Sequence, residues 1–142
     1  MAVQTSYSTN ITPAFVGQIA NTEIYNVISR TIEDANVGFG VALAQGAEDM
    51  GAKVGTGTFI GVTVRDRSVE AKNQNTFAVG STAGLMTKGV IWVVAGETVV
   101  AGDAAGFDAT GKIVKAATGT EIPSARFDTS GSTGELVKLR LG

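Results

Sequence analysis

The sequence predicts an all-β protein, a small β-barrel or sandwich of short antiparallel strands with an extended N-terminal arm. Apolar and β-branched runs are short, and turn residues interrupt them about every 8–12 residues, as in small barrels and sandwiches. Nineteen of the 142 residues are glycine and show no collagen-like period, which indicates turns between strands. No stretch sustains the apolar spacing of a long amphipathic helix.

A chain of this length is most economically one domain, and two regions differ in composition. Residues 1–29 contain a single charged residue, Glu23, and few bulky apolar side chains. This region is predicted to be an extended arm that gains order by lying on its own body, on a sister subunit or on another protein. Residues 30–142 are predicted to form the β-rich body.

The first strands of the body follow from apolar and β-branched runs. Ile24–Ile32 is rich in β-branched residues and is predicted to be a strand that leads from the arm into the body. Val37–Ala44 and Gly55–Val64 are predicted to be the next two strands. The polar stretches Gln45–Gly51 and Asp66–Thr76 are predicted to be loops, the first with room for one short helical turn.

Gly89–Ala117 is predicted to be a compact meander around a buried Trp92. Leu85 and Met86 lead into it, and Val90–Val94 is apolar at every position, which is typical of a strand covered on both faces. Further strands are expected at Val99–Ala101 and Lys112–Val114, with Asp103 and Asp108 as turn formers.

After this meander, Thr118–Ser124 is predicted to be a loop and Ala125–Phe127 a short strand. Leu136–Leu141 alternates and is predicted to be a half-buried strand. The predicted core side chains are Phe39, Phe59, Trp92, Phe107 and Leu139.

Composition excludes several classes of function. The formal net charge is -2 and no block of like charge occurs, which argues against nucleic-acid binding. The absence of His and Cys removes thiolate chemistry, the usual zinc ligands and the commonest general base. We therefore expect no catalytic residue, no metal and no cofactor. No apolar run is long enough to cross a membrane, and the N-terminal residues lack the pattern of a secretory signal. The lack of Cys is compatible with a reducing cytoplasm.

Three patterns have a possible chemical reading. The glycines of Gly55–Gly61 resemble a phosphate-binding loop, but no helix pattern follows them. Asp103 with Asp108, the pair Glu48-Asp49, and Asp66 with Glu70 could bind calcium adventitiously, although none has the spacing of a calcium-binding loop. The aromatic side chains could form a sugar platform, yet their spread along the chain is what a β core produces.

In order and spacing, several stretches resemble the structural cement, or decoration, proteins of tailed bacteriophages. They cover nearly the whole chain: Phe15–Ala20, Val27–Thr31, Val37–Ala42, Phe59–Asp66, Leu85–Val93, Val100–Asp103, Ile122–Ser130 and the terminal strand. One departure is Ala104–Phe107, where similar proteins often have proline or an aromatic residue.

The resemblance implies a non-enzymatic virion component on the capsid exterior, whose partners are the major capsid protein and further copies of itself. Such a protein binds the expanded head, bridges neighbouring capsomers and stabilises the shell against packaged DNA. A homo-oligomer is expected, a trimer rather than a dimer. Large apolar side chains dominate interface energies, so the expected capsid or subunit contacts in the arm are Phe15, Val16, Ile19, Ile24 and Tyr25. The alternatives are a carbohydrate-binding or adhesive module of the tail or virion surface and, less favoured, a hydrolase.

Overall fold

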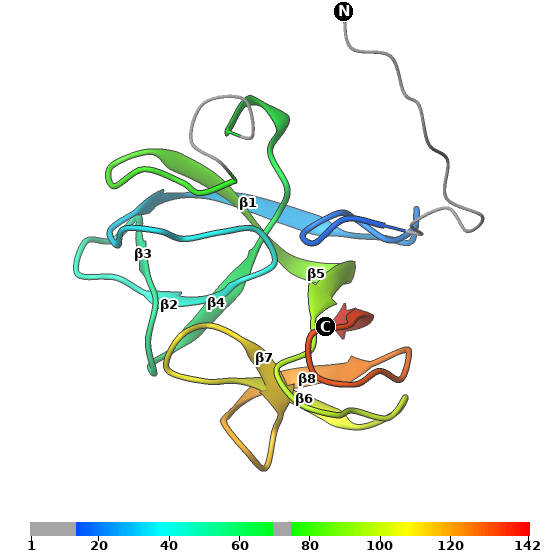
Figure 1. Cartoon of the computed structure of the whole chain (residues 1–142). Helices are drawn as coiled ribbons and strands as arrows, with labels where there is room; N and C mark the ends of the chain where they lie inside the picture. Colours follow the sequence, from blue (N-terminus) through cyan, green and yellow to red (C-terminus); the bar gives the residue numbers. More distant parts are fainter. Residues whose placement is uncertain (1–13, 70–74) are drawn as a thin grey trace, which may run out of the picture.

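In the computed structural model, which describes residues 14–69 and 75–142, these residues form two β-rings that share one long strand (Figure 1). The shared strand is β5 (Thr82–Val94), of 13 residues. The strand order is β1-β3-β2-β4-β5-β9-β8-β6-β7, with a further pairing between β1 and β5. The other strands are β1 (Asn26–Ile32), β2 (Ala42–Gln45), β3 (Gly51–Lys53), β4 (Phe59–Thr63), β6 (Ala104–Phe107), β7 (Ile113–Lys115), β8 (Thr120–Phe127) and β9 (Leu136–Leu141).

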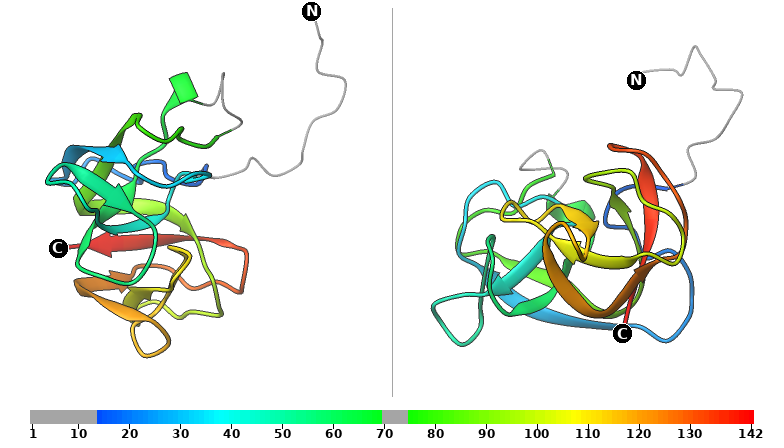
Figure 2. Two further views of the ribbon diagram at one scale, coloured as in Figure 1. Left: turned by 90° about the vertical axis from the view of Figure 1, so that its left-hand side faces the viewer. Right: turned by 90° about the horizontal axis from the view of Figure 1, so that it is seen from below.

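The first ring is closed by β1, which pairs with β3 in parallel and with β5 in an antiparallel register. The second ring runs from β5 through β9, β8 and β6 to β7. A single parallel bridge between Ala95 and Ile113 returns it to the end of β5. The views in Figure 2 show the two rings stacked with β5 passing between them. The all-β prediction is therefore confirmed.

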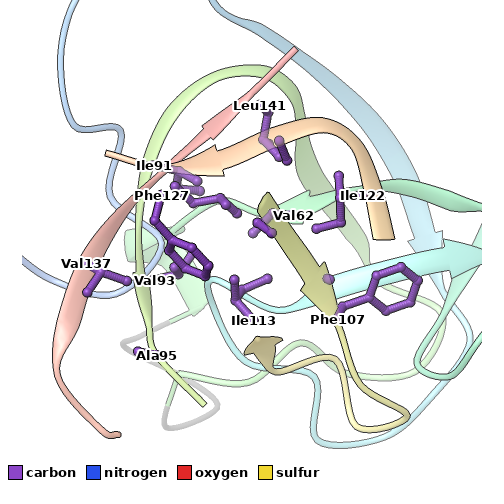
Figure 3. Close-up of a cluster of buried hydrophobic side chains, with 14 of the residues drawn as sticks. Val62, Ile91, Val93, Ala95, Phe107, Ile113, Ile122, Phe127, Val137 and Leu141 are labelled. Atoms are coloured by element: carbon purple, nitrogen blue, oxygen red, sulfur yellow. The ribbon is translucent and has the colours of Figure 1, made fainter. Parts of the chain in front are cut away.

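Each ring has its own hydrophobic core, and strand alternation sends neighbouring residues into different cores. Leu43 of β2 and Leu85 of β5 belong to the core of the first ring. Their neighbours Ala42 and Met86 belong to the larger cluster of the second ring. Figure 3 shows this larger cluster, in which Phe107, Ile113, Ile122 and Phe127 converge. The wall formed by β2, β4 and β5 is thus apolar on both faces.

Three of the five predicted core residues are buried as expected. Phe107 and Leu139 are completely buried, and Phe39 is nearly so. Phe59 is only partly buried and packs against the larger cluster, with its ring centroid 5.8 Å from that of Phe107.

The prediction that Trp92 lies at the packed centre is wrong. Its side chain is half-buried and belongs to neither core cluster, whereas its neighbours Ile91 and Val93 are completely buried. Strand alternation places Trp92 on the opposite face of β5 from these two residues. There the Lys138 Nζ lies 5.3 Å from the centroid of the Trp92 ring. Trp92 therefore covers the edge of the body instead of filling it.

The final strand follows its predicted alternation, since Val137, Leu139 and Leu141 are buried while Lys138 and Arg140 are partly exposed. Other boundaries differ from the predictions. Val37–Val41 is not part of β2, and β3, β6 and most of β8 were not predicted. Val99–Ala101 contributes one bridge, from Val99 to Gly131, and then a turn.

The predicted turn at Asp108 is confirmed. The Gly111 N–H donates to the Asp108 carbonyl at 3.0 Å. The Asp108 carboxylate accepts hydrogen bonds from the Thr110 N–H at 2.8 Å and the Lys112 N–H at 3.1 Å. Burial alone would raise the pKa of Asp108, but hydrogen bonds from the Thr110 hydroxyl and from the Thr110 and Lys112 N–H groups outweigh it and hold that pKa below its ordinary value of 3.8. Asp108 is thus a turn former with its hydrogen-bonding capacity used locally.

Replacing Asp108 with alanine should lower the free energy of unfolding by about 1 kcal/mol, because it removes acceptors for turn donors. Asp108→Asn should cost much less, since the amide oxygen still accepts. The contribution of the carboxylate is fully present above pH 3.8 and is lost as the pH falls further through the lower folded-state pKa. Urea unfolding of both variants at pH 7 tests the ranking. Equal costs for both changes would contradict it.

Candidate functional site

The described part of the arm begins by lying along β5 of its own body. The Gly17 N–H donates to the Trp92 carbonyl at 2.7 Å, and the Trp92 N–H donates to the Gln18 carbonyl at 2.9 Å. The Ala20 N–H donates to the Val90 carbonyl at 2.9 Å. The sequence left open whether the arm lies on its own body, on a sister subunit or on another protein. Residues 17–20 lie on their own body as an edge segment. Residues 1–13 of the predicted arm lie outside the described residues.

β1 continues the same antiparallel pairing further along β5, so the expected boundary after residue 29 falls inside a strand. Ile19 pairs with Ile91 and Asn26 pairs with Lys88. Between these two pairs, the two residues Gly89 and Val90 of β5 face the six residues Ala20–Tyr25. The surplus chain leaves the sheet as a loop, here called the 21–25 loop (Asn21–Tyr25).

One polar contact forms inside the 21–25 loop, and a second holds the loop against the body. The Asn21 side chain accepts a hydrogen bond from the Glu23 N–H at 3.1 Å. The Arg140 Nη1 donates to the Glu23 Oε2 at 2.6 Å, while its Nη2 lies 2.7 Å from the Asp128 Oδ2. Arg140 thus joins the loop to β9 and to the segment that follows β8.

The electrostatics of this triad follow from its geometry. The hydrogen bond from Arg140 is the main cause that lowers the pKa of Glu23 below its ordinary value of 4.5. Hydrogen bonds to Glu23 and Asp128 raise the pKa of Arg140, so the guanidinium stays charged. Glu23 and Arg140 are partly open to solvent, with side-chain exposures of 49% and 31%, so salt screens the pair. The contact orients the loop more than it stabilises the fold.

Glycine at position 89 allows the end of the loop to approach β5. Its φ is +120°, in the left-handed half of conformational space that other residues rarely adopt. A Cβ atom placed there would lie 2.5 Å from the Tyr25 Cβ. Tyr25 therefore lies directly over Gly89, and any side chain at this position would displace it.

The loop and its surroundings present large apolar side chains to solvent. Ile24 is 82% exposed, Tyr25 50% and the neighbouring Val27 38%. Phe15 is also exposed, and the Arg65 guanidinium lies 4.2 Å from the centroid of its ring. Exposed apolar side chains that gather in one patch are typical of interaction sites.

The five arm residues singled out from sequence therefore fall into two groups. Phe15, Ile24 and Tyr25 are exposed and available for contact. Val16 and Ile19 are partly buried, Val16 against the core of the first ring and Ile19 against that of the second. The exposed Val27 was not predicted as a contact, although its place beside Ile24 and Tyr25 in a β-branched run was visible in the sequence.

The other sequence patterns form no chemical site in the described residues. Asp66 accepts hydrogen bonds from the Ser68 hydroxyl and N–H, and Asp103 accepts one from the Val100 N–H. Gly55–Gly61 leads into β4 and not into a helix. Within residues 14–69 and 75–142, no group of three or more acidic, His or Cys side chains is placed to hold a metal ion. No helix in these ranges has the length and apolar character needed to span a bilayer.

Replacing Glu23 with glutamine should loosen the 21–25 loop while the fold persists, because the loop then loses its ionic link to Arg140. In the unchanged protein the link is complete above pH 4.5 and is lost as the pH falls further through the lower folded-state pKa of Glu23. Backbone ¹⁵N relaxation should show reduced order at Ile24 and Tyr25 in the variant at neutral pH. The exposed Glu121→Gln is the matched control, and equal loop order in both variants would contradict the link.

Comparisons with known proteins agree with this architecture. A family model described as structural cement protein (E217 gp24/Pam3 gp6) matches residues 3–142. A chain from the capsid of Myoviridae phage XM1 superposes with a TM-score of 0.76 at 12% identity, covering 100% of this chain and 98% of that one. The head fibre gp8.5 N base of bacteriophage phi29 gives 0.49 at 15% identity, covering 84% and 95%. The search of curated proteins finds no significant match.

Proposed function

Because this chain belongs to the structural cement proteins of tailed bacteriophages, we propose that it binds the exterior of the expanded head through the 21–25 loop. It is a capsid cement protein and part of the virion. The finer proposal concerns how it attaches. The observation that carries it is the 82% exposure of Ile24 on a loop that Arg140 and Gly89 hold in place.

A preorganised apolar loop suits attachment to a shell. Large side chains that leave water at the centre of an interface contribute most of its binding energy. A loop already fixed by hydrogen bonds gives up little further conformational entropy when it docks. Many copies then act together, so that each modest interface adds to the stability of the whole head.

The partners are proposed to be the major capsid protein and further copies of this chain. Association with the capsid shell follows from the family. A trimer is proposed over a dimer, because three capsomers meet around each local three-fold position of a closed shell and a three-fold cement protein can contact all of them. No catalytic role is proposed, since the chain lacks His and Cys and the turn aspartates are engaged locally.

Binding to empty expanded heads tests the proposal. The purified full-length chain should bind saturably, and an image reconstruction should show its density outside the shell between capsomers. Unexpanded heads are the matched control and should bind fewer copies. Affinity for a glycan with no binding to heads would favour a carbohydrate-binding virion module. Density inside the shell would also contradict the proposal.

A further inference from the structure

A groove of about 400 Å³ lies where the two rings meet. Its walls come from Phe39 and Val41 before β2, from Val94 at the end of β5, and from the turns at Gly111 and Gly134. The side chain of Val16 forms a further part of the wall. Lys112 is the one charged residue among the described residues that line it. The groove therefore suits an uncharged, partly apolar occupant.

Close packing fixes the shape of the groove. A Cβ atom at Gly40 would lie 2.7 Å from the Val16 Cγ2, and one at Gly111 would lie 2.4 Å from the Val41 Cγ1. Both glycines also have positive φ, +67° and +83°. Glycine at these two positions therefore lets the Val16 and Val41 side chains pack directly against the backbone of the groove.

One backbone edge is open inside the groove. The N–H and C=O groups of Trp92 point away from β9, toward residues 17 and 18. Those of Ala95 point the other way, to Glu135 and Gly134. Since strand residues alternate, the N–H and C=O of Val94 point into the groove, and no described residue outside the strands hydrogen-bonds to them. An added strand can pair there by β-augmentation.

The chain contains a segment of matching chemistry. Residues 1–13 contain no charged side chain. In Val3–Ile11 the odd positions are Val3, Thr5, Tyr7, Thr9 and Ile11, whereas the even positions are Gln4, Ser6, Ser8 and Asn10. This alternation is typical of a strand with one apolar face. The segment joins the body at Ala14, two residues before Val16.

The way residues 14–18 connect the segment to the body favours a segment from a second copy as the occupant of the groove. The Gln18 N–H donates to the Phe15 carbonyl at 3.1 Å, so a turn reverses the chain immediately before it reaches β5. The edge beside Trp92 is already taken by residues 17–20 of the same chain. Thirteen extended residues reach about 40 Å, enough to cross from one subunit to a neighbour.

We propose that the groove at Val94 binds the segment Val3–Ile11 of a neighbouring copy as an added β-strand. This inference deepens the homo-oligomer part of the proposed function and rests on it. In a closed ring of subunits, each copy gives its segment to one neighbour and receives the segment of the other. Head attachment through the 21–25 loop is a separate event at a separate surface.

Engineered cysteines test the pairing directly, because the chain has none of its own. Chains carrying only Val94→Cys are mixed with longer, tagged chains carrying only Tyr7→Cys, and the mixture is oxidised. A disulfide requires Cα atoms within about 7 Å. The expected product is a mixed disulfide between the two kinds of chain. Val3→Cys and Ile11→Cys sample neighbouring registers, and the exposed Thr120→Cys is the control that should remain unlinked.

The opposite outcomes are distinguishable. A Val94→Cys/Tyr7→Cys double variant that links only within single chains would assign the groove to its own segment and overturn the proposal. Absence of any link to Val94→Cys in all three registers would overturn it as well.

Self-association in solution gives a second measure. In sedimentation velocity, Val94→Lys and a deletion of residues 2–13 should each raise the concentration needed for oligomers at least tenfold, with an unchanged far-UV spectrum. Oligomers unaffected by both changes, or an unchanged protein that is monomeric at all concentrations, would refute the proposal. Ile24→Asp should leave self-association intact, so failure of head binding and failure of the groove are observed separately.

Discussion

Replacing Phe127 with alanine should lower the free energy of unfolding by about 3–5 kcal/mol, a large part of the stability of a domain of this size. Phe127 is completely buried in the larger core, where β8 pairs with β9 opposite Leu139. Neighbouring strands fix the walls around it, so the vacated space cannot close. Guanidinium unfolding followed by far-UV circular dichroism measures the loss.

Trp92→Ala is the informative comparison, because a sequence-based interpretation ranks Trp92 as the central core residue. Its half-buried ring lies at the edge of the body, and its removal leaves an open surface and not an enclosed cavity. We expect a cost of about 1–2 kcal/mol, within the ordinary range of single substitutions. A loss as large as that of Phe127→Ala would show that Trp92 is a core residue after all.

Replacing Ile24 with aspartate should weaken binding to expanded heads at least about 30-fold, which corresponds to roughly 2 kcal/mol for a central interface residue. The new charge would be buried against the shell without a partner. Tyr25→Ala should give a smaller loss of the same sign. The midpoint of thermal unfolding should stay within about 2 °C of that of the unchanged protein, because Ile24 is 82% exposed. Titration of empty heads with labelled protein measures the affinity.

Val79→Asp is the matched control for this experiment. Val79 is also an exposed large apolar residue, at 62%, but it lies near the opposite end of β1, where the Gly80 N–H donates to the Ile32 carbonyl. The seven residues of β1 place its two ends six steps apart, about 20 Å. Equal losses for Ile24→Asp and Val79→Asp would indicate a general effect of surface charge and would argue against the 21–25 loop as the docking element.

Strands with strong local patterns could be predicted from sequence. β9 alternates strictly, and the second half of β5, Val90–Val94, is apolar at every position. β6 was missed because Ala104-Ala105-Gly106 lacks β-branched residues, and its place is set by pairing with β7 and β8. The part of β8 before Ala125 was missed because proline is rarely tolerated inside a strand. Ser124 adopts a φ of +61° directly after Pro123, and this irregularity lets Ile122 and Ala125 both point inward.

The candidate site was partly visible in sequence. Ile24 and Tyr25 could be singled out as apolar residues in a region of low charge. Their exposure on a loop could not be predicted. It arises because six residues, Ala20–Tyr25, face only two residues of β5. The Arg140–Glu23 contact joins residues 117 positions apart, and no local pattern signals it. Val16 and Ile19 are apolar like the exposed arm residues, so the sequence does not distinguish them. Only the tertiary structure shows that they pack against the body.

Because both rings share β5, the two rings are expected to unfold together. The first half of β5 closes one ring and its second half supports the other, so opening either ring strips hydrogen bonds from β5 and exposes apolar side chains of both cores. Neither half can therefore melt while the other persists as an independent foldon. The hydrogen-bonded amide protons of β5 are then expected to exchange only through global unfolding.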